Sequence, residues 1–389
     1  MKVLDGIRVL DLGGFITAPL ATMLLADLGA DVIKVERPGS GDPFRSFRAG
    51  CYSPQFQAHN RNKRSITLDY TEAEGREVLV ALVKAADVVV FNNRPGVAER
   101  LGLGYDRLRE VNPRLVYCSI TGFGEDGPYA QRPAFDNVGQ ALSGWMSRHR
   151  IEGDDPRVVG PAVSDAATGL FAALGIVGAL FERSRSGQGH RVDVNMLEAT
   201  LGLGAEPLGQ FLATGTPVPV YQRAAMSQAY NLTCADGKRI GLHLSSLDKF
   251  WQALCEVIER PEWIERYPKR LDRVAHYETL ARQLDGIFRT RPRADWMLRL
   301  EARDVPFAPE LAMEDLESDP HVRHLGVFHE LDHPRYGKVR SPHRAVRIDG
   351  RRDTTFRPPP DLGEHTDDVL QQLGLERDRI AALRGRGLI

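Results

Sequence analysis

The feature that most constrains the fold is an alternation of β-rich and helical segments in the N-terminal third of the chain. Residues 86–91 (ADVVVF) and 115–120 (LVYCSI) are short apolar runs, typical of strands buried on both faces of a sheet. The clearest helix is 71–85, with Thr71 expected as its cap and Glu74 completing a capping box. The series also contains strands at 7–12 and 31–36 and a helix at 19–28. This alternation predicts an α/β fold with a parallel sheet covered by helices.

The remainder of the chain is long enough for a second domain. Residues 170–183 are apolar nearly all round a helix, so we expect that helix to be buried. Residues 204–226 are interrupted repeatedly by Gly and Pro and are predicted to be loop-like. A second unit follows, with a hairpin signal at Asp236-Gly237. Its helices are predicted at 249–259 and 277–289.

Charge and cysteine content argue against several classes of protein. The chain has 51 Lys and Arg against 52 Asp and Glu, a net charge of −1, which gives no general attraction to nucleic acid or anionic membranes. Its four cysteines are far apart and form no CxxC pair, as in proteins with reduced thiols. Asp5 and Arg8 interrupt the N-terminus before a signal sequence can develop, and the apolar stretch 170–181 is too short to span a bilayer. We therefore expect a soluble cytoplasmic protein.

Three loops at predicted strand ends carry basic side chains. Arg37 follows the strand at 31–36, residues 60–64 (NRNKR) precede another β-rich run, and residues 92–96 (NNRPG) follow the strand at 86–91. Ligands of open α/β sheets bind at the carboxyl ends of the strands. Guanidinium and ammonium groups at such a place suit phosphates. The loops favour a phosphate-bearing ligand; the alternative is a solvated basic face that pairs with surface acids.

Several common catalytic motifs are incomplete or missing. Residues 122–127 (GFGEDG) match the GxGxxG pattern after a strand, but Pro128 and Pro133 interrupt the helix that a dinucleotide site needs. The glycine pair after the first strand also lacks the spacing of that site, which argues against an NAD enzyme. No GxSxG or GxxxxGK[ST] motif is present. Four histidines at 321–333 have no metal-ligand spacing, so we predict no metal site.

Asp165 is the most informative single carboxylate. It lies in the segment VSDAATG, directly before the apolar helix. An aspartate at such a position is ordinarily an N-cap that accepts hydrogen bonds from free backbone N–H groups. A carboxylate there is also held ionised by the helix dipole, as a nucleophile requires. Both interpretations of Asp165 stay open on these residues alone.

Taken together, the motifs resemble those of class III CoA-transferases, the family of formyl-CoA transferase and carnitine CoA-transferase. The resemblance runs nearly from end to end and in a constant order. The segments that carry it are 4–12, 27–42, 60–68, 92–96, 102–105, 112–115, 119–124, 165–169, Arg183 with 187–189, and 362–366.

This resemblance implies an architecture that composition could not show. We expect a Rossmann-like large domain with a parallel sheet, formed by residues 1–203 and by a C-terminal part, 326–389, that returns to it. A linker at 204–228 would lead to a smaller α+β domain at 229–325. Two chains would form an interlocked homodimer. The substrates implied are an acyl-CoA and a free carboxylic acid, with no prosthetic group.

The resemblance also implies the site residues. Asp165 takes the position of the active-site aspartate. Contacts with CoA would come from Phe15, Arg37, Leu68, Asn92, Asn93 and Arg100. Asn93 stands where an aromatic or apolar residue is common, which puts its contact in question. Ile16 replaces a glutamine that shapes the site of formyl-CoA transferase, which argues against oxalate or formate as the acid. The acid pocket would be shaped by the small domain and by residues 140–157.

Two alternatives remain. Acyl-CoA racemases of the same superfamily abstract a proton with a histidine in a Gly-His-Asp motif, and here the matching residues are Ala134-Phe135-Asp136. Phenylalanine cannot take a proton, which disfavours a racemase or epimerase. A non-catalytic CoA-binding protein is the other alternative, and the presence of Asp165 disfavours it.

Overall fold

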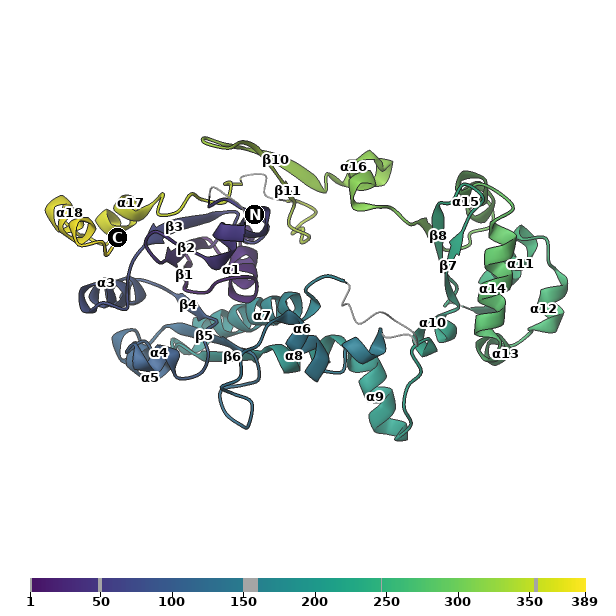
Figure 1. Cartoon of the computed structure of the whole chain (residues 1–389), viewed down its shortest axis with the longest axis horizontal. Helices are drawn as coiled ribbons and strands as arrows, with labels where there is room; N and C mark the ends of the chain where they lie inside the picture. The colour runs from purple at the N-terminus through teal and green to yellow at the C-terminus, as the bar shows by residue number, and fades with distance from the viewer. Residues whose placement is uncertain (1, 48–50, 150–159, 246, 353–355) are drawn as a thin grey trace. The chain divides into compact units, whose positions relative to one another are not determined.

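The structure is a computed structural model that describes residues 2–47, 51–149, 160–245, 247–352 and 356–389 (Figure 1). The chain divides into two compact units. Unit 1 holds the described residues of Met1–His149, Gly153–Ala205 and Gly326–Ile389, and unit 2 holds those of Glu206–Leu325. Unit 1 therefore combines segments from both ends of the chain.

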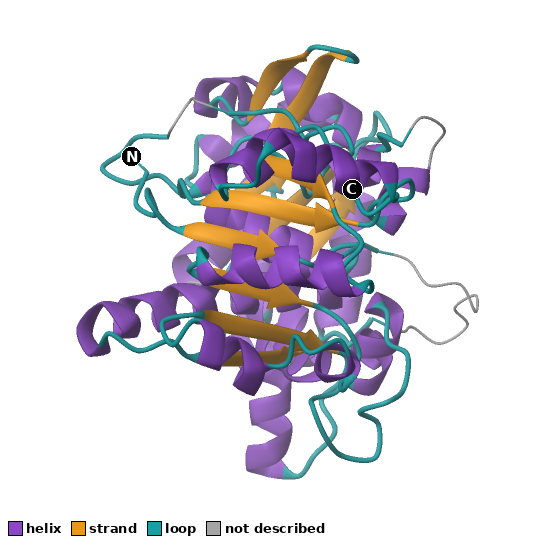
Figure 2. Cartoon of the chain, turned by 90° about the vertical axis from the view of Figure 1, so that its left-hand side faces the viewer, coloured by secondary structure: helices purple, strands orange, loops and turns teal. Residues whose placement is uncertain are grey.

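A six-stranded parallel sheet forms the centre of unit 1. Its strands are β1 (Arg8–Asp11), β2 (Asp31–Glu36), β3 (Lys63–Thr67), β4 (Val88–Phe91), β5 (Val116–Thr121) and β6 (Arg191–Asn195). They lie in the order β3-β2-β1-β4-β5-β6, and Figure 2 shows their arrows side by side and pointing the same way. The chain adds β2 and β3 on one side of β1 and then returns to add β4 on the other. This reversal creates a switch point beyond the carboxyl ends of β1 and β4, where ligands of such sheets bind.

Helices cover both faces of this sheet. They are α1 (Thr17–Asp27), α3 (Ala73–Lys84), α5 (Tyr105–Val111), α7 (Val163–Ser186), α17 (Thr366–Gln372) and α18 (Arg377–Gly385). Val9 and Val88 share one core cluster with α1 and α7. Their neighbours Leu10 and Val89 point to the other face and share a cluster with α3, α5, α17 and α18. The continuous apolar strands are thus explained, because both faces are covered, and the predicted α/β fold is confirmed.

The C-terminal segment lies along β3, the edge strand of the sheet. The backbone N–H of His365 donates to the carbonyl oxygen of Ser65. The N–H of Thr67 donates to Oγ1 of Thr366, at 3.0 Å. These bonds satisfy backbone groups that an edge strand would otherwise leave open.

Helix α7 differs from its prediction in length and in burial. It begins at Val163, so it spans 24 residues, and it is the single helix in the described ranges whose length and hydropathy would also suit a membrane span. Ala172 and Ile176 are buried in the core cluster of the sheet. Leu174 and Phe181 on the other side are 67% and 66% exposed, so the prediction of burial all round is wrong for the single chain. The sheet covers one side of α7, and the apolar residues on its other side are therefore left exposed in the single chain.

The rest of unit 1 consists of short elements. A hairpin of β10 (Phe328–His333) and β11 (Gly337–Pro342) is antiparallel, with Gly337 at a φ of +71°. The other helices are α2 (Pro54–Gln57), α4 (Val97–Arg100), α6 (Asp136–Leu142) and α8 (Met196–Leu203), with 3₁₀ turns at Pro43–Phe47 and Met146–Arg148.

Unit 2 is a small α+β unit, as predicted. Its antiparallel sheet contains β7 (Ala229–Thr233), β8 (Arg239–His243) and β9 (Phe307–Pro309), and the hairpin at Asp236-Gly237 joins the first two. Its helices are α10 (Gln222–Ser227), α11 (Leu247–Val257), α12 (Glu262–Arg266), α13 (Arg270–Ala275), α14 (Tyr277–Phe288), α15 (Arg293–Glu301) and α16 (Pro320–Leu325), with a 3₁₀ turn at Met313–Ser318. The ring of Trp296 stacks on Phe288 at 4.4 Å within the core of this unit.

Two local predictions are wrong. The loop-like stretch contains α9 (Ala205–Thr214) and α10, because Pro207 falls in the first turn of α9, where proline is tolerated, and Gly215 ends the helix with a φ of +66°. Helix α3 begins at Ala73, two residues later than predicted. The Thr71 hydroxyl donates to the Asp69 carboxylate, so it does not cap the helix.

Candidate active site

A cavity of about 360 Å³ lies beyond the carboxyl ends of β1, β4 and β5 in unit 1. Four of the predicted site residues line it together: Phe15, Asn92, Asn93 and Asp165. They come from the loops after β1 and β4 and from the first turn of α7. The cavity therefore occupies the switch point of the sheet, and residues far apart in sequence meet there because parallel strands end at one edge.

Asp165 is the third residue of α7, so the predicted N-cap position is wrong. The helix starts at Val163, and its first turn is capped from outside by another carboxylate. Oδ1 of Asp136 accepts hydrogen bonds from the N–H groups of Ser164 (2.8 Å) and Asp165 (3.1 Å). The Asp165 side chain is thereby relieved of the capping role and faces the cavity instead.

The electrostatics of Asp165 also differ from expectation. Burial, with a further contribution from the nearby Asp136 carboxylate, raises the pKa of Asp165 to about 7. The shift is therefore upward, opposite to the direction expected from a carboxylate at a helix N-terminus, and its causes are desolvation first and like-charge repulsion second. A carboxylate with a strongly raised pKa in a cleft is a candidate for a chemical role.

The loop after β1 forms one wall of the cavity and is held by Asn92. Oδ1 of Asn92 accepts from the N–H of Gly14 at 3.1 Å. Its Nδ2 donates to the Gly14 carbonyl at 2.7 Å and to Oγ1 of Thr17 at 3.0 Å. Asn92 thus fixes the loop after β1, and both N–H groups of its amide are used in that role. Its Oδ1 accepts one hydrogen bond in the loop and has a second lone pair that can accept another.

Aromatic side chains form the apolar part of the cavity. The ring of Phe15 meets Phe135 edge to face at 5.7 Å and Phe44 at 5.4 Å. Phe135 is 61% exposed and lines the cavity, which includes no histidine among its described residues. Phe135 thus stands where a racemase would need an imidazole. An aromatic wall of this kind suits an apolar portion of a ligand.

Two arginines add positive charge at the rim. Arg94 and Arg132 are both exposed and both line the cavity, and Arg132 lies over the ring of Tyr129 at 3.8 Å. Arg94 belongs to a loop in which the sequence indicated basic residues, whereas Arg132 and the capping Asp136 were missed. Asp136 was considered only as part of the stretch that matches the racemase motif, and its capping role follows from the approach of α6 to the start of α7.

The other three predicted CoA residues do not line this cavity. Arg37 and Arg100 are exposed in the loop after β2 and at the end of α4, both at the carboxyl edge of the sheet. The side chain of Leu68 is buried in the core, and its N–H donates to the carbonyl of Glu36. Leu68 could therefore meet a ligand only through its remaining backbone atoms.

The basic segment 60–64 is not a ligand loop. Arg61, Lys63 and Arg64 are buried and form salt bridges with Asp27, Asp11 and Asp31, respectively. They sit at the amino end of β3, which is opposite to the ligand edge. The prediction of phosphate-binding groups there is wrong, because tertiary pairing occupies all three cations.

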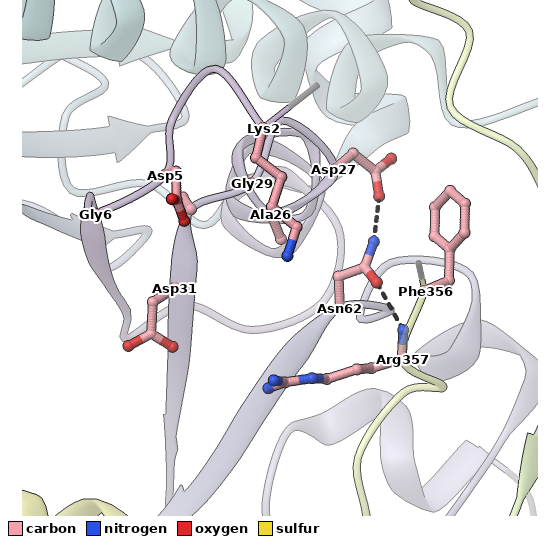
Figure 3. A pocket seen from close by; sticks show the side chains of 11 residues that line it. Lys2, Asp5, Gly6, Ala26, Asp27, Gly29, Asp31, Asn62, Phe356 and Arg357 are labelled. Carbon is pink, nitrogen blue, oxygen red and sulfur yellow. Dashed lines mark hydrogen bonds between the residues drawn. The ribbon is translucent and has the colours of Figure 1, made fainter. Parts of the chain in front are cut away.

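A second cavity, of about 280 Å³, lies at those amino ends (Figure 3). Asp27 lines it and accepts a hydrogen bond from Nδ2 of Asn62 at 2.8 Å, and Oδ1 of Asn62 accepts one from the N–H of Arg357. Lys2 and Asp5 complete its charged lining. The Asp27 carboxylate is held there by Arg61 and Asn62, so these groups join neighbouring segments of unit 1.

The structure describes one end of the region that was predicted to shape the acid pocket. Gln140 on α6 is buried, and its Nε2 donates to Oδ2 of Asp136 at 2.5 Å. Residues 150–157 of that predicted region lie outside the described residues. Gln140 therefore orients the carboxylate that caps α7.

The chain is similar to known proteins over nearly its whole length. The family model for CoA-transferase family III matches residues 4–366. Succinyl-CoA:glutarate CoA-transferase of Homo sapiens is 33% identical, covering 100% of this chain and 90% of that protein. Formyl-CoA:oxalate CoA-transferase of Rhodopseudomonas palustris (strain BisA53) is 34% identical, covering 100% of this chain and 97% of that protein.

A solved structure shows the same fold. The crystal structure of a CAIB/BAIF family protein from Brucella suis matches with a TM-score of 0.83 and 31% identity, covering 95% of this chain and 99% of that one. The sequence relatives act on CoA thioesters and carboxylic acids by name. The chain belongs to CoA-transferase family III and is an enzyme that transfers CoA between an acyl-CoA and a carboxylic acid.

Proposed function

We propose that Asp165 is the nucleophile of the transfer and carries the acyl group and then CoA in turn. The observation that supports this most is its position: a half-buried carboxylate with a pKa of about 7, in a cavity at the switch point of the sheet. Covalent catalysis divides a difficult exchange into easier acyl transfers. The ionised carboxylate is the form that reacts, and with this pKa a large fraction of Asp165 is ionised at neutral pH.

The proposed transfer proceeds in four steps. A carboxylate oxygen of Asp165 attacks the thioester carbonyl of the donor, the C–S bond breaks, and a mixed anhydride and CoA thiolate form. The thiolate attacks the aspartyl carbonyl, which gives an aspartyl-CoA thioester and releases the donor acid. The acceptor carboxylate then attacks this thioester to form a second anhydride and thiolate. Attack of the thiolate on the acceptor carbonyl gives the new acyl-CoA and frees Asp165.

We further propose where CoA lies. Phe15, Asn92 and Asn93 border the cavity beside Asp165, and the Phe15 and Phe135 rings would contact apolar parts of the ester. Arg37 and Arg100, at the same edge of the sheet, would meet the phosphates, with Arg94 and Arg132 nearer the cavity. Leu68 would contribute backbone contact. Ile16 also lines the cavity, which supports an acid other than formate or oxalate.

The working enzyme is proposed to be an interlocked homodimer in the cytoplasm. The exposed apolar side of α7, with Leu174 and Phe181, supports a second chain as its cover. No prosthetic group, metal, nucleic acid or membrane is proposed to take part. The four cysteines are free thiols, which suits a reducing compartment.

The test combines exchange and trapping. Purified protein is incubated with CoA esters, succinyl-CoA among them, and a panel of isotope-labelled free acids, and label entering the thioester is measured. Hydroxylamine added during turnover should convert Asp165 to a hydroxamate, which peptide mass spectrometry locates. Trapping at another residue, or exchange that persists in Asp165→Ala, would overturn the nucleophile. A racemase would instead exchange the α-proton of the ester with solvent and label no acid.

A further inference from the structure

A network of buried charges lies directly behind the loop that carries Phe15. Lys34 on β2 and Asp11 on β1 are fully buried, and Asp42 is 4% exposed. Nζ of Lys34 lies 2.9 Å from Oδ2 of Asp42 and 3.6 Å from Oδ2 of Asp11. Lys63, also fully buried, reaches the same Asp11 oxygen at 2.9 Å. Two lysines and two aspartates therefore share one interior site.

Stability alone is a poor explanation for such a network. Removing charges from water is costly, and well-packed apolar residues of similar volume often stabilise a fold equally well or better. A role for the network is therefore sought in the backbone groups that its side chains bind. Asp11 and Lys34 stand at or near the carboxyl ends of their strands, at the edge where the cavity opens.

The network ends on the backbone of the cavity loop. Nζ of Lys34 donates to the carbonyl of Gly13 at 2.8 Å, and Oδ1 of Asp11 accepts from the N–H of Gly13. Oδ1 of Asp42 accepts from the N–H of Phe15 at 3.2 Å. Asn92 binds both the N–H and the C=O of Gly14, which lies between them. The backbone N–H and C=O groups of Gly13 and Gly14 and the N–H of Phe15 therefore all have a side-chain partner.

Phe15 needs this support because its backbone is strained. Its φ of +62° lies in the left-handed region, which residues with a Cβ adopt rarely and keep only where the surroundings fix them. In this conformation its ring meets Phe135 at 5.7 Å and borders the cavity that contains Asp165. A loop released from Lys34 and Asp42 would relax toward negative φ and swing the ring away from that position.

We propose that Lys34 and Asp42 are a positioning pair that holds Phe15 in its strained conformation and so keeps the CoA-ester cavity in shape. The pair touches no reacting atom and acts through the loop. This inference rests on the proposed function insofar as the cavity beside Asp165 is where the ester binds. It adds that the shape of the cavity depends on an ion pair in the protein interior.

The test uses Lys34→Met, Asp42→Asn and a matched control, Asp27→Asn. Asp27 is also buried and paired, with Arg61, but it lies at the amino ends of the strands beside the second cavity (Figure 3). Each protein is assayed for CoA binding by calorimetry and for exchange at a temperature well below its own melting transition. Because Lys34→Met leaves Asp42 without its nearest cation, the double variant Lys34→Met/Asp42→Asn, which removes both charges, is made beside it.

The expected result is a loss of function in folded protein. A displacement of about 1 Å in a positioned group can cost up to a hundredfold in rate, so we expect kcat/KM to fall by roughly tenfold to a hundredfold in Lys34→Met and in the double variant. Asp42→Asn keeps an acceptor oxygen for the Phe15 N–H and should lose about tenfold at most. Asp27→Asn should keep wild-type kcat/KM while melting at a lower temperature.

Three results would overturn the proposal. The first is wild-type kcat/KM in both Lys34→Met and the double variant. The second is a loss in Asp27→Asn equal to that in Lys34→Met. The third is a crystal structure of Lys34→Met in which Phe15 keeps its left-handed φ, whatever the activity of that variant. Failure of the proposed function looks different, since exchange would then persist in Asp165→Ala or hydroxylamine would label another residue, whatever the result for Lys34→Met.

Discussion

Oδ1 of Asp136 accepts a hydrogen bond from the backbone N–H of Asp165, at 3.1 Å. One carboxylate therefore caps the helix on which the other is carried, and the two negative charges are kept close together. The second carboxylate raises the pKa of Asp165 in addition to the larger effect of burial. The start of α7 thus sets both the position and the protonation of the proposed nucleophile.

This relationship predicts the pH dependence of exchange. With a pKa of about 7 for Asp165, kcat/KM should rise with pH through neutrality and fall at lower pH, because only the ionised carboxylate attacks. Asp136→Asn removes the neighbouring charge, so the pH at which kcat/KM rises should be lower in this variant. Asp106→Asn, at the exposed start of α5, is the control and should leave that pH unchanged. An unchanged pH dependence of kcat/KM in Asp136→Asn would contradict the coupling between the two carboxylates.

Asp165→Asn should abolish exchange, by roughly a thousandfold or more, and yet stabilise the fold at high pH. The pKa of Asp165 is raised from its ordinary value of 3.8 to about 7, so its ionised form opposes folding. The gain in melting temperature, a few degrees by the usual scaling, should be full above pH 7, shrink as the pH falls from 7 to 4, and vanish below about 4. Melting curves at pH 8, 6 and 4 test this sign. A variant less stable than wild type at pH 8 would contradict it.

Close packing of α7 against α1 predicts a large effect of Gly169→Ala. An added Cβ would lie 2.9 Å from Cδ2 of Leu20 and 3.0 Å from the carbonyl oxygen of Thr17. Overpacking of this kind costs about 1–3 kcal/mol in the free energy of unfolding. Gly286→Ala on α14 adds a Cβ into open space and should stabilise by up to about 1 kcal/mol through helix propensity. Denaturant unfolding of both variants checks the contrast, and equal effects would refute the packing argument.

Arg37→Ala should raise the KM for CoA esters by about tenfold while changing kcat little, since a phosphate contact is made equally in the ground and transition states. The increase should shrink at high salt, which screens exposed charges. Arg109→Ala, an exposed arginine on α5, serves as the control. An unchanged KM in Arg37→Ala would return Arg37 to the alternative of a solvated surface charge.

The sequence predicted the sheet well, because buried parallel strands leave a strong local signal. The strand at 31–36 was predicted with the bounds of β2, and the run at 86–91 contains β4. Helix starts were predicted less well. Thr71 and Asp165 both had the residue type of a cap, but the side chain that actually caps α7 comes from Asp136, 29 residues earlier in the chain.

The site was predicted only in part, because a local sequence does not show which charged side chains pair with one another in the fold. Asp165 and Asn92 lie in motif segments, the family resemblance added Phe15, and the fold brings all three to one cavity. The basic segment 60–64 was misinterpreted because a lysine buried against an aspartate and a lysine bound to phosphate look alike in sequence. Only the register of β3 beside β2 shows that Lys63 points inward to Asp11.

The bonds between β3 and the C-terminal segment bear on the order of synthesis. All residues that line the cavity precede Ala205, whereas the segment that closes the outer edge of β3 contains His365 and Thr366. During synthesis, all residues of the cavity therefore leave the ribosome long before the segment that covers this edge. During this interval the bare strand is a template for pairing with other chains. A protein shortened before residue 363 would keep the edge open permanently and should aggregate with its cavity residues all present.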